Sequence, residues 1–262
     1  MKFTHFDAHT HVQFPVYDVD RNEVIERALN EGVGMVNIGA DAETSRHAVT
    51  LARKYDTGVY ATVGLHPGDA SKGFDYEAYK TLAMDEKVVA IGECGFDFLR
   101  IAEDVEAAKK MQKEILLQQM KLSFEVKKPL MIHCRNAMSE FIELLKEHKE
   151  ILIPNSVMHF FSGNPEEAKQ LLELGFYFTF GGVITFVHDY DETIKVIPLD
   201  RLLTETDAPY VTPVPHRGKR NEPVFVIETE KKLAELKGVS PEAMALQIIK
   251  NTEKAFAVNL SA

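Results

Sequence analysis

Short apolar segments alternate with longer amphipathic segments along most of the chain. Each short segment is rich in β-branched and aromatic residues, as buried strands are, and the longer segments mix charged and apolar residues at helical spacing. Eight short segments occur, at residues 3–9, 34–39, 59–65, 88–93, 129–134, 156–161, 176–181 and 202–207. The distance between most of them fits a strand, a helix and two loops, which predicts a parallel sheet covered by helices.

Helices are expected between these strands and after the last one. The pattern predicts helices at 19–31, 42–55, 165–174 and 223–236, and Asn164 is a suitable N-cap before Pro165. Two more helical stretches are expected after Pro241, packed outside the barrel. A longer helix is expected within 103–128, where these apolar residues recur at helical spacing: Val105, Ala108, Met111, Ile115, Met120 and Leu122.

Eight strand–helix units are the number that closes an α/β barrel. A chain of 262 residues has the ordinary length for a (β/α)8 TIM barrel. An open, doubly wound sheet is the competing topology. Because no linker rich in glycine, serine or proline divides the chain, we expect a single domain spanning residues 1–262.

Charge and composition limit the classes of function. The formal net charge is −10, which disfavours a protein that coats polyanions non-specifically. It does not exclude an enzyme that acts on nucleic acids, because bound cations can supply positive charge locally. The start of the chain lacks an apolar leader, the longest apolar stretch at 176–187 is too short to cross a bilayer, and two cysteines make a poor disulfide framework. We expect a cytoplasmic protein that does not associate with membranes.

Histidine and acidic residues fall at the expected C-terminal ends of the strands, where barrel enzymes have their active sites. His9 and His11 are two residues apart, so both side chains can point into the barrel mouth. Alone, this pair is weak evidence of a metal site, Glu93 could belong to an ion pair, and Asp207 could cap the turn before Pro209. The whole set is His9, His11, His66, Glu93, His133, His159 and Asp207.

Together these groups indicate a metal centre. Burying so many charged groups costs several kcal/mol unless they are paired, and a bound cation would pair them. Imidazole nitrogen and carboxylate oxygen suit Zn, Mn and related divalent ions. The set exceeds the needs of one tetrahedral ion, so a two-metal site is expected, with Glu93 as a candidate bridge. Cys94 and Cys134 are interpreted as core thiols rather than ligands, since strand alternation turns Cys94 away from Glu93.

The motifs FDAHTH, GLHP, IGECGFDF, IHCR, HFFSG, LLTETDAP and RGKRNEP, in this order along essentially the whole chain, resemble the TatD family of metal-dependent deoxyribonucleases. That family belongs to the amidohydrolase-type barrels. Where related barrels carry a carboxylated lysine on strand 4, this chain has Glu93. It departs from the family pattern at Cys94, where an aliphatic residue is more usual, and at Phe96, where leucine is common.

The resemblance implies a (β/α)8 fold and a divalent-metal phosphodiesterase that acts on DNA. By position it also implies two metal-ion sites that share Glu93. One ion would be held by His9, His11, Glu93 and Asp207, and the second by Glu93, His133 and His159.

The expected chemistry is hydrolysis by a water molecule that two divalent ions (Zn, Mn or Mg) activate. Asp207 is our candidate for the residue that takes the water's proton, and Glu93 for the one that sets the spacing of the ions. His66 is assigned a phosphate contact or proton donation. Its alternative role is to fix the turn before Pro67.

Basic residues near the strand ends are candidates for DNA phosphate contacts. Arg217, Lys219 and Arg220 follow the last strand, and Arg135 follows His133. The alternatives are a solvated loop and, for the segment from Asn221 onward, the start of a helix.

An acidic protein with few basic contacts should bind DNA weakly. We therefore expect an exonuclease that acts on single-stranded or frayed ends, as a monomer or weak oligomer. Two rivals remain: a metal-dependent hydrolase of a lactone, amide or aminoacyl ester, and a barrel retained as a binding module without catalysis.

Overall fold

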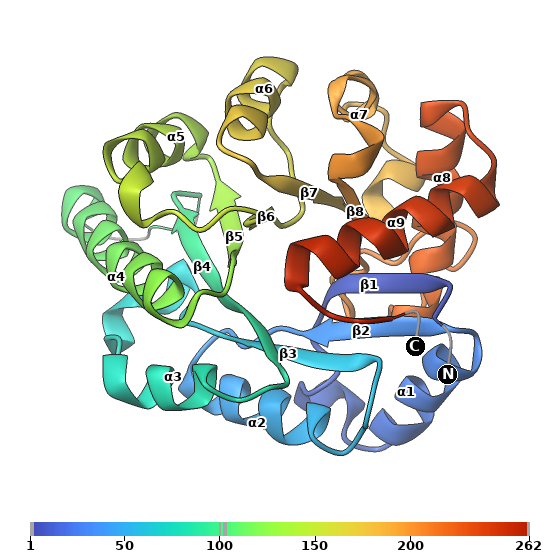
Figure 1. Ribbon diagram of the computed structural model, residues 1–262, viewed down its shortest axis with the longest axis horizontal. Coiled ribbons are helices and arrows are strands. Elements are labelled where there is room, and N and C mark those ends of the chain that lie inside the picture. Colours follow the sequence, from blue (N-terminus) through green and yellow to red (C-terminus); the bar gives the residue numbers. More distant parts are fainter. Residues whose placement is uncertain (1–2, 100, 102–103, 261–262) are drawn as a thin grey trace.

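The strands form one parallel sheet that is rolled into a barrel (Figure 1). The computed structural model of the protein describes residues 3–99, 101 and 104–260. Within these residues eight strands lie side by side in chain order, and each neighbouring pair is parallel. Their bounds are β1 His5–Thr10, β2 Val33–Asn37, β3 Val59–Val63, β4 Val88–Asp97, β5 Leu130–Arg135, β6 Val157–Met158, β7 Tyr177–Phe180 and β8 Leu202–Thr204.

The two ends of the sheet meet where the segment after β8 reaches the end of β1. Thr10 and Ala208 form a parallel bridge. The backbone N–H of Asp207 donates to the carbonyl of His9 at 2.9 Å, and that of His11 donates to the carbonyl of Ala208 at 2.9 Å. These bonds nearly close the barrel, which confirms the (β/α)8 fold and excludes the doubly wound sheet.

Helices surround the barrel (Figure 1). The predicted helices are present with slightly different bounds, and 223–236 opens with a 3-10 turn, Pro223–Phe225, before α8. The side chain of Asn164 accepts hydrogen bonds from two backbone N–H groups of α6, as an N-cap does. Position 103 of the expected long helix lies outside the described residues. The helices are α1 Arg21–Asn30, α2 Ala42–Ala52, α3 Tyr76–Ala83, α4 Val105–Val126, α5 Met138–Glu147, α6 Pro165–Glu173, α7 Asp191–Val196, α8 Val226–Lys237 and α9 Pro241–Phe256.

The segment after Pro241 differs from the prediction. Up to residue 260 it contains a single helix, α9, rather than two helical stretches, because no glycine or proline interrupts its apolar repeat. The side-chain amide of Asn251 donates to the carbonyls of Leu199 and Leu202, at 2.8 and 2.7 Å, at the start of β8. Helix α9 therefore covers the N-terminal end of the barrel, opposite the strand ends with the candidate site (Figure 1). None of the helices in the described part of the chain has the length and apolar character needed to cross a bilayer.

Candidate metal centre

A cavity of about 570 Å³ opens at the C-terminal ends of the strands. The side chain of His9 is fully buried beside it. Strand β4 continues beyond Glu93 to Asp97, so Glu93 lies within the strand rather than at its end. The cavity wall contains seven residues that the sequence analysis selected: His11, His66, Glu93, His133, Arg135, His159 and Asp207.

Gly92 and Gly95, on either side of Glu93 in β4, allow this part of the strand to lie close to β5. Gly92 and Gly95 both have positive φ angles, 149° and 139°. A Cβ atom on Gly92 would lie 2.3 Å from the carbonyl oxygen of Met131, and one on Gly95 would lie 1.9 Å from that of His133. Strand β4 can therefore approach β5 this closely only with glycine at both positions.

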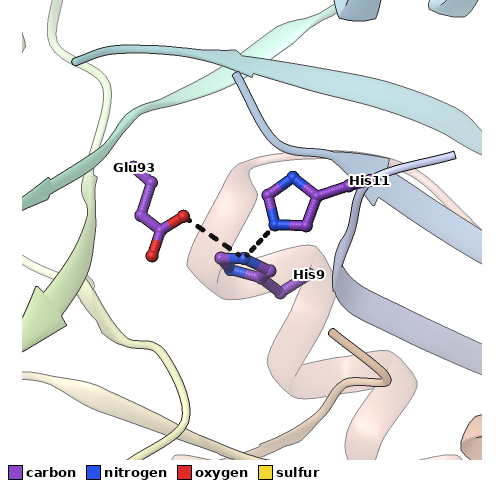
Figure 2. A group of neighbouring side chains, drawn as sticks. All are labelled: His9, His11 and Glu93. Carbon is purple, nitrogen blue, oxygen red and sulfur yellow. Dashed lines mark hydrogen bonds and ion pairs between the residues drawn. The ribbon is translucent and has the colours of Figure 1, made fainter. Parts of the chain in front are cut away.

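The first potential ligand group joins β1 to β4. His9, His11 and Glu93 point toward one another (Figure 2), with 3.2 Å between the two Nε2 atoms and 3.7 Å from His9 Nε2 to Glu93 Oε2. Asp207 Oδ1 lies 3.7 Å from His9 Nε2 and 3.5 Å from His11 Nε2. His11 Nδ1 lies 3.0 Å from the carbonyl oxygen of Ile38, which can only accept, so the neutral ring has its lone pair on Nε2.

The second potential group uses the other oxygen of Glu93. Glu93 Oε1 lies 2.9 Å from Nδ1 of His133 and 3.6 Å from Nε2 of His159. One nitrogen or oxygen atom per residue lies within 4.8 Å of the others in the His9, His11 and Glu93 group and in the Glu93, His133 and His159 group, close enough to surround a single cation. Asp207 meets the same criterion together with His9 and His159. The two groups share Glu93, which presents one carboxylate oxygen to each. This arrangement and its donor atoms fit a pair of divalent ions.

Two acidic residues that the sequence analysis missed hold the histidines of the second group. Nδ1 of His159 lies 2.9 Å from Glu205, and Nε2 of His133 lies 3.2 Å from Asp97. Both carboxylates are buried, and Thr179 also donates to Glu205. Carboxylates in this position fix the ring orientation of metal-binding histidines. Spacing gave a signal for both, because Asp97 follows Glu93, and Glu205 precedes Asp207, by an even number of residues.

The charges of the cluster are coupled. Burial by itself would raise the pKa of Glu93, but the imidazoles of His66, His133 and His159 lower it well below its ordinary value. Burial and the neighbouring His159 lower the pKa of His9, whose ring stacks on that of His159 with centroids 3.5 Å apart. Glu93 is therefore ionised and His9 neutral at neutral pH, the states in which each binds metal.

The pKa values of His159 and His133, the two histidines that contact Glu205 and Asp97, are raised rather than lowered. Burial opposes the charged form of His159, but the Glu205 carboxylate raises its pKa to about 10. Burial likewise opposes the charged form of His133, and its hydrogen bonds to Asp97 and Glu93 raise its pKa. Without metal, these two imidazoles hold a proton that a cation would displace.

His66 fixes a turn, as considered from the sequence, and its role toward phosphate stays a prediction. Its Nδ1 accepts a hydrogen bond from the backbone N–H of Gly68 at 3.0 Å, which fixes the turn that begins at Pro67. The neutral ring must then have its proton on Nε2, which lies 3.8 Å from Glu93 Oε1 at the cavity wall. His66 thus presents a hydrogen-bond donor to the cavity.

The cysteines stand apart from the potential ligand groups. The thiol of Cys94 is buried against the carbonyls of Ile91 and Met131, away from the cavity. Cys134 is partly buried and borders the cavity, so it is less of a core residue than expected. Burial raises the pKa of both thiols. Among the described residues, neither belongs to a group that could hold a metal ion.

Comparisons with known proteins find relatives over nearly the whole chain. Residues 6–257 match the family model described as TatD related DNase. An uncharacterized metal-dependent hydrolase of Bacillus subtilis, YabD, is 40% identical over 97% of this chain and 99% of its own length. A protein of Cronobacter sakazakii named 3'-5' ssDNA/RNA exonuclease TatD is 35% identical over 98% of this chain and 99% of its own length. The chain belongs to the TatD family.

A solved structure shows the same relationship. The crystal structure of YJJV, a TatD homologue from Escherichia coli K12, has a TM-score of 0.89 and 30% identity, and the match covers 99% of this chain and 100% of that one. The resemblance inferred from the motifs is therefore confirmed, and with it an enzyme of the metal-dependent hydrolase class.

The four basic residues selected in this TatD-family chain occupy different environments. Arg135 lies on the cavity wall, is exposed, and has no ion-pair partner among the described residues. Arg217, Lys219 and Arg220 do not line the cavity in the part of the chain that the structure describes.

Arg220 is held in an ion pair. Its guanidinium donates two hydrogen bonds to Asp20, contacts Glu222 and lies over the ring of Tyr17. Arg217 lies over the ring of Phe186. Arg135 is therefore the basic residue best placed to contact a group inside the cavity, and the phosphate contacts of the other three stay predictions.

Proposed function

We propose that this TatD-family protein hydrolyses phosphodiester bonds of DNA and acts exonucleolytically on single-stranded or frayed ends. The observation that carries the proposal is the position of Glu93, which offers one oxygen to each of two histidine groups beside an accessible cavity. The exposed guanidinium of Arg135 on the cavity wall favours a phosphate substrate over a neutral ester or amide. The name of the Cronobacter relative is consistent with this reading.

The proposed cofactor is a pair of divalent ions: Zn, Mn or Mg. One would be held by His9, His11, Glu93 and Asp207, and the other by Glu93, His133 and His159. When bound, such ions would lower the pKa of a coordinated water molecule toward neutral pH and would neutralise charge on the phosphoryl group. The many imidazoles favour Zn or Mn over Mg, which prefers oxygen ligands and water.

The chain's own residues orient the substrate and move the proton. Asp207 is partly exposed at the cavity and is our candidate acceptor for the proton of the attacking water. Arg135 would bind a non-bridging phosphate oxygen. Nε2 of His66 lies near Oε1 of Glu93, whereas His9 lies near Oε2. The Nε2–H group of His66 would donate to the phosphate or to the leaving oxygen.

The net charge of −10 predicts weak, salt-sensitive binding of DNA and easy release of product. We propose a cytoplasmic enzyme that works as a monomer or weak oligomer, with one domain over residues 1–262.

The test is hydrolysis of a short single-stranded DNA labelled separately at each end. Metal-stripped protein would receive Mg, Mn or Zn, beside Glu93→Ala and the control Glu143→Ala, which removes an exposed carboxylate of α5. We expect metal-dependent cleavage that Glu93→Ala abolishes and Glu143→Ala retains, with a product ladder that gives the polarity. Metal-loaded protein that cleaves no DNA but hydrolyses a lactone, amide or aminoacyl ester would replace the nuclease proposal.

A further inference from the structure

Apolar side chains are exposed at the barrel mouth beside the cavity. Phe186 is 38% exposed, Tyr210 53% and Val214 44%. Phe186 follows β7, whereas Tyr210 and Val214 follow β8, so the three side chains come from loops after neighbouring strands. Single exposed apolar residues need no explanation, but three on adjoining loops beside a candidate active site are a candidate binding surface.

The two loops are packed together and continue the cavity wall. The backbone N–H of Val214 donates to Thr185 Oγ1 at 2.9 Å. A Cβ atom on Gly182 would lie 2.4 Å from the carbonyl oxygen of Val211, so the loops approach at a distance that only glycine allows. Tyr210 and Val211 line the cavity. The exposed apolar surface and the cavity are therefore continuous.

The same surface carries the guanidinium of Arg217, unpaired within the described part of the chain, although the β7–α7 loop also has the exposed carboxylate of Asp189. The Arg217 guanidinium lies 4.2 Å from the ring centre of Phe186 and donates to the carbonyl of Thr212 at 2.8 Å. No carboxylate pairs with Arg217 among the described residues. Between Asp207 and Glu222 the sequence contains no acidic residue, although the net charge of the chain is −10. The β8–α8 loop therefore carries no negative charge between Asp207 at the cavity and Glu222.

We propose that Phe186, Tyr210, Val214 and Arg217 form a second nucleic-acid subsite, which we call the distal shelf. It would hold nucleotides of a single strand beyond the one in the cavity. This proposal rests on the proposed nuclease function.

The distal shelf combines aromatic rings with a guanidinium, and a polynucleotide combines bases with phosphates. Aromatic rings and arginine planes stack bases without regard to sequence, and an unpaired guanidinium neutralises the adjacent phosphate. A lactone or amide would fit within the cavity and would leave the shelf unused. A protein partner would use the apolar side chains but gives no reason for the unpaired charge.

The test compares a 12-nucleotide single strand with a dinucleotide as substrates, for metal-loaded wild type and for Phe186→Ala, Tyr210→Ala and Arg217→Ala. Matched controls are Phe124→Ala, an exposed ring near the end of α4, and Arg46→Ala, an exposed guanidinium on α2. Binding of the labelled 12-mer to metal-free protein, followed by fluorescence anisotropy, gives a second readout that does not depend on catalysis.

We expect each shelf variant to lower the ratio of kcat/KM on the 12-mer to that on the dinucleotide about tenfold, with a similar loss of 12-mer affinity. For Arg217→Ala, the dependence of log affinity on log salt should also weaken by about 0.7, the slope of one lost phosphate contact on a single strand. The controls should match the wild type in all three measurements.

Two results would overturn the proposal, and they are distinguishable. The first is that wild type cleaves the 12-mer and the shelf variants keep the wild-type ratio of kcat/KM values and the wild-type affinity for the 12-mer. The shelf is then not a nucleic-acid subsite, although the nuclease function stands. If metal-loaded wild type cleaves neither substrate, the proposed function fails and the shelf proposal fails with it.

Discussion

Nδ1 of His159 lies 2.9 Å from the buried carboxylate of Glu205, while Nε2 of the same ring faces Glu93. The carboxylate thus decides which nitrogen is turned toward the candidate metal centre. Asp97 holds His133 in the same manner, with the two ring nitrogens exchanged. The proposed second metal site is therefore oriented by two acidic residues outside its proposed ligand set.

Removing Glu205 should weaken the proposed second metal site. We expect Glu205→Ala to lower the affinity for one of the two ions about 10- to 100-fold, because the His159 ring loses its anchor. Glu205→Gln keeps an oxygen that can accept from Nδ1–H, so its loss should be smaller. Stepwise metal titration of stripped protein, monitored by calorimetry, measures both, with circular dichroism as the check of folding. Equal affinities in both variants and wild type would exclude this role.

Asp207 should matter more for the rate than for the fold. Asp207→Asn leaves the shape of the side chain but removes the proposed proton acceptor, so kcat on single-stranded DNA should fall about 10²- to 10⁴-fold. The control is Asp189→Asn, which changes an exposed carboxylate on the β7–α7 loop. Metal content is measured in both proteins. A full rate in metal-loaded Asp207→Asn would assign the proton to another residue.

Metal affinity should rise with pH. Because the pKa of His159 is raised to about 10, metal-free protein keeps a proton on this ring through neutral pH, and the metal must displace it. For one displaced proton the affinity rises about tenfold per pH unit, or about 100-fold from pH 6 to pH 8. His133, whose pKa is also raised, acts in the same direction.

Calorimetry in buffers of different ionisation enthalpy tests this linkage. Binding at pH 7 should release at least about one proton. An affinity that does not change between pH 6 and pH 8 would contradict the prediction.

The close approach of β4 to β5 should make Gly95 intolerant of substitution. Gly95→Ala places a Cβ atom 1.9 Å from the carbonyl of His133 at a φ of 139°, and should destabilise the protein by about 3 kcal/mol or more. Gly218 also has a positive φ, 84°, but its Cβ position is open. Gly218→Ala should therefore cost only about 1 to 2 kcal/mol. Urea unfolding of the metal-free proteins measures the difference. Equal unfolding midpoints for Gly95→Ala and Gly218→Ala would show that the close contact of Gly95 with His133 does not control stability.

Local pattern was sufficient for the strands and for most of the potential metal ligands. Strand β4, Val88–Asp97, is mostly apolar and buried on both faces, which is typical of a strand between helices and a barrel interior. Candidate ligands such as His9 and His11 could be located because parallel strands place their C-terminal ends at one rim. The two helical stretches expected after Pro241 were wrong, since periodicity alone does not show where one helix is interrupted.

The sequence by itself thus determined the alternating strands and helices, the strand ends at which the chemistry lies, and the candidate ligands, because hydrophobic period is a local property, whereas the closure of the sheet into a barrel was decided by the tertiary structure. Only the tertiary structure decided that Glu93 divides its oxygens between two histidine groups and that Glu205 and Asp97 anchor the rings. It also decided that Arg220 is held by Asp20 while Arg135 faces the cavity. These outcomes depend on distances between residues far apart in the chain, which strand register and loop packing set and no local pattern encodes.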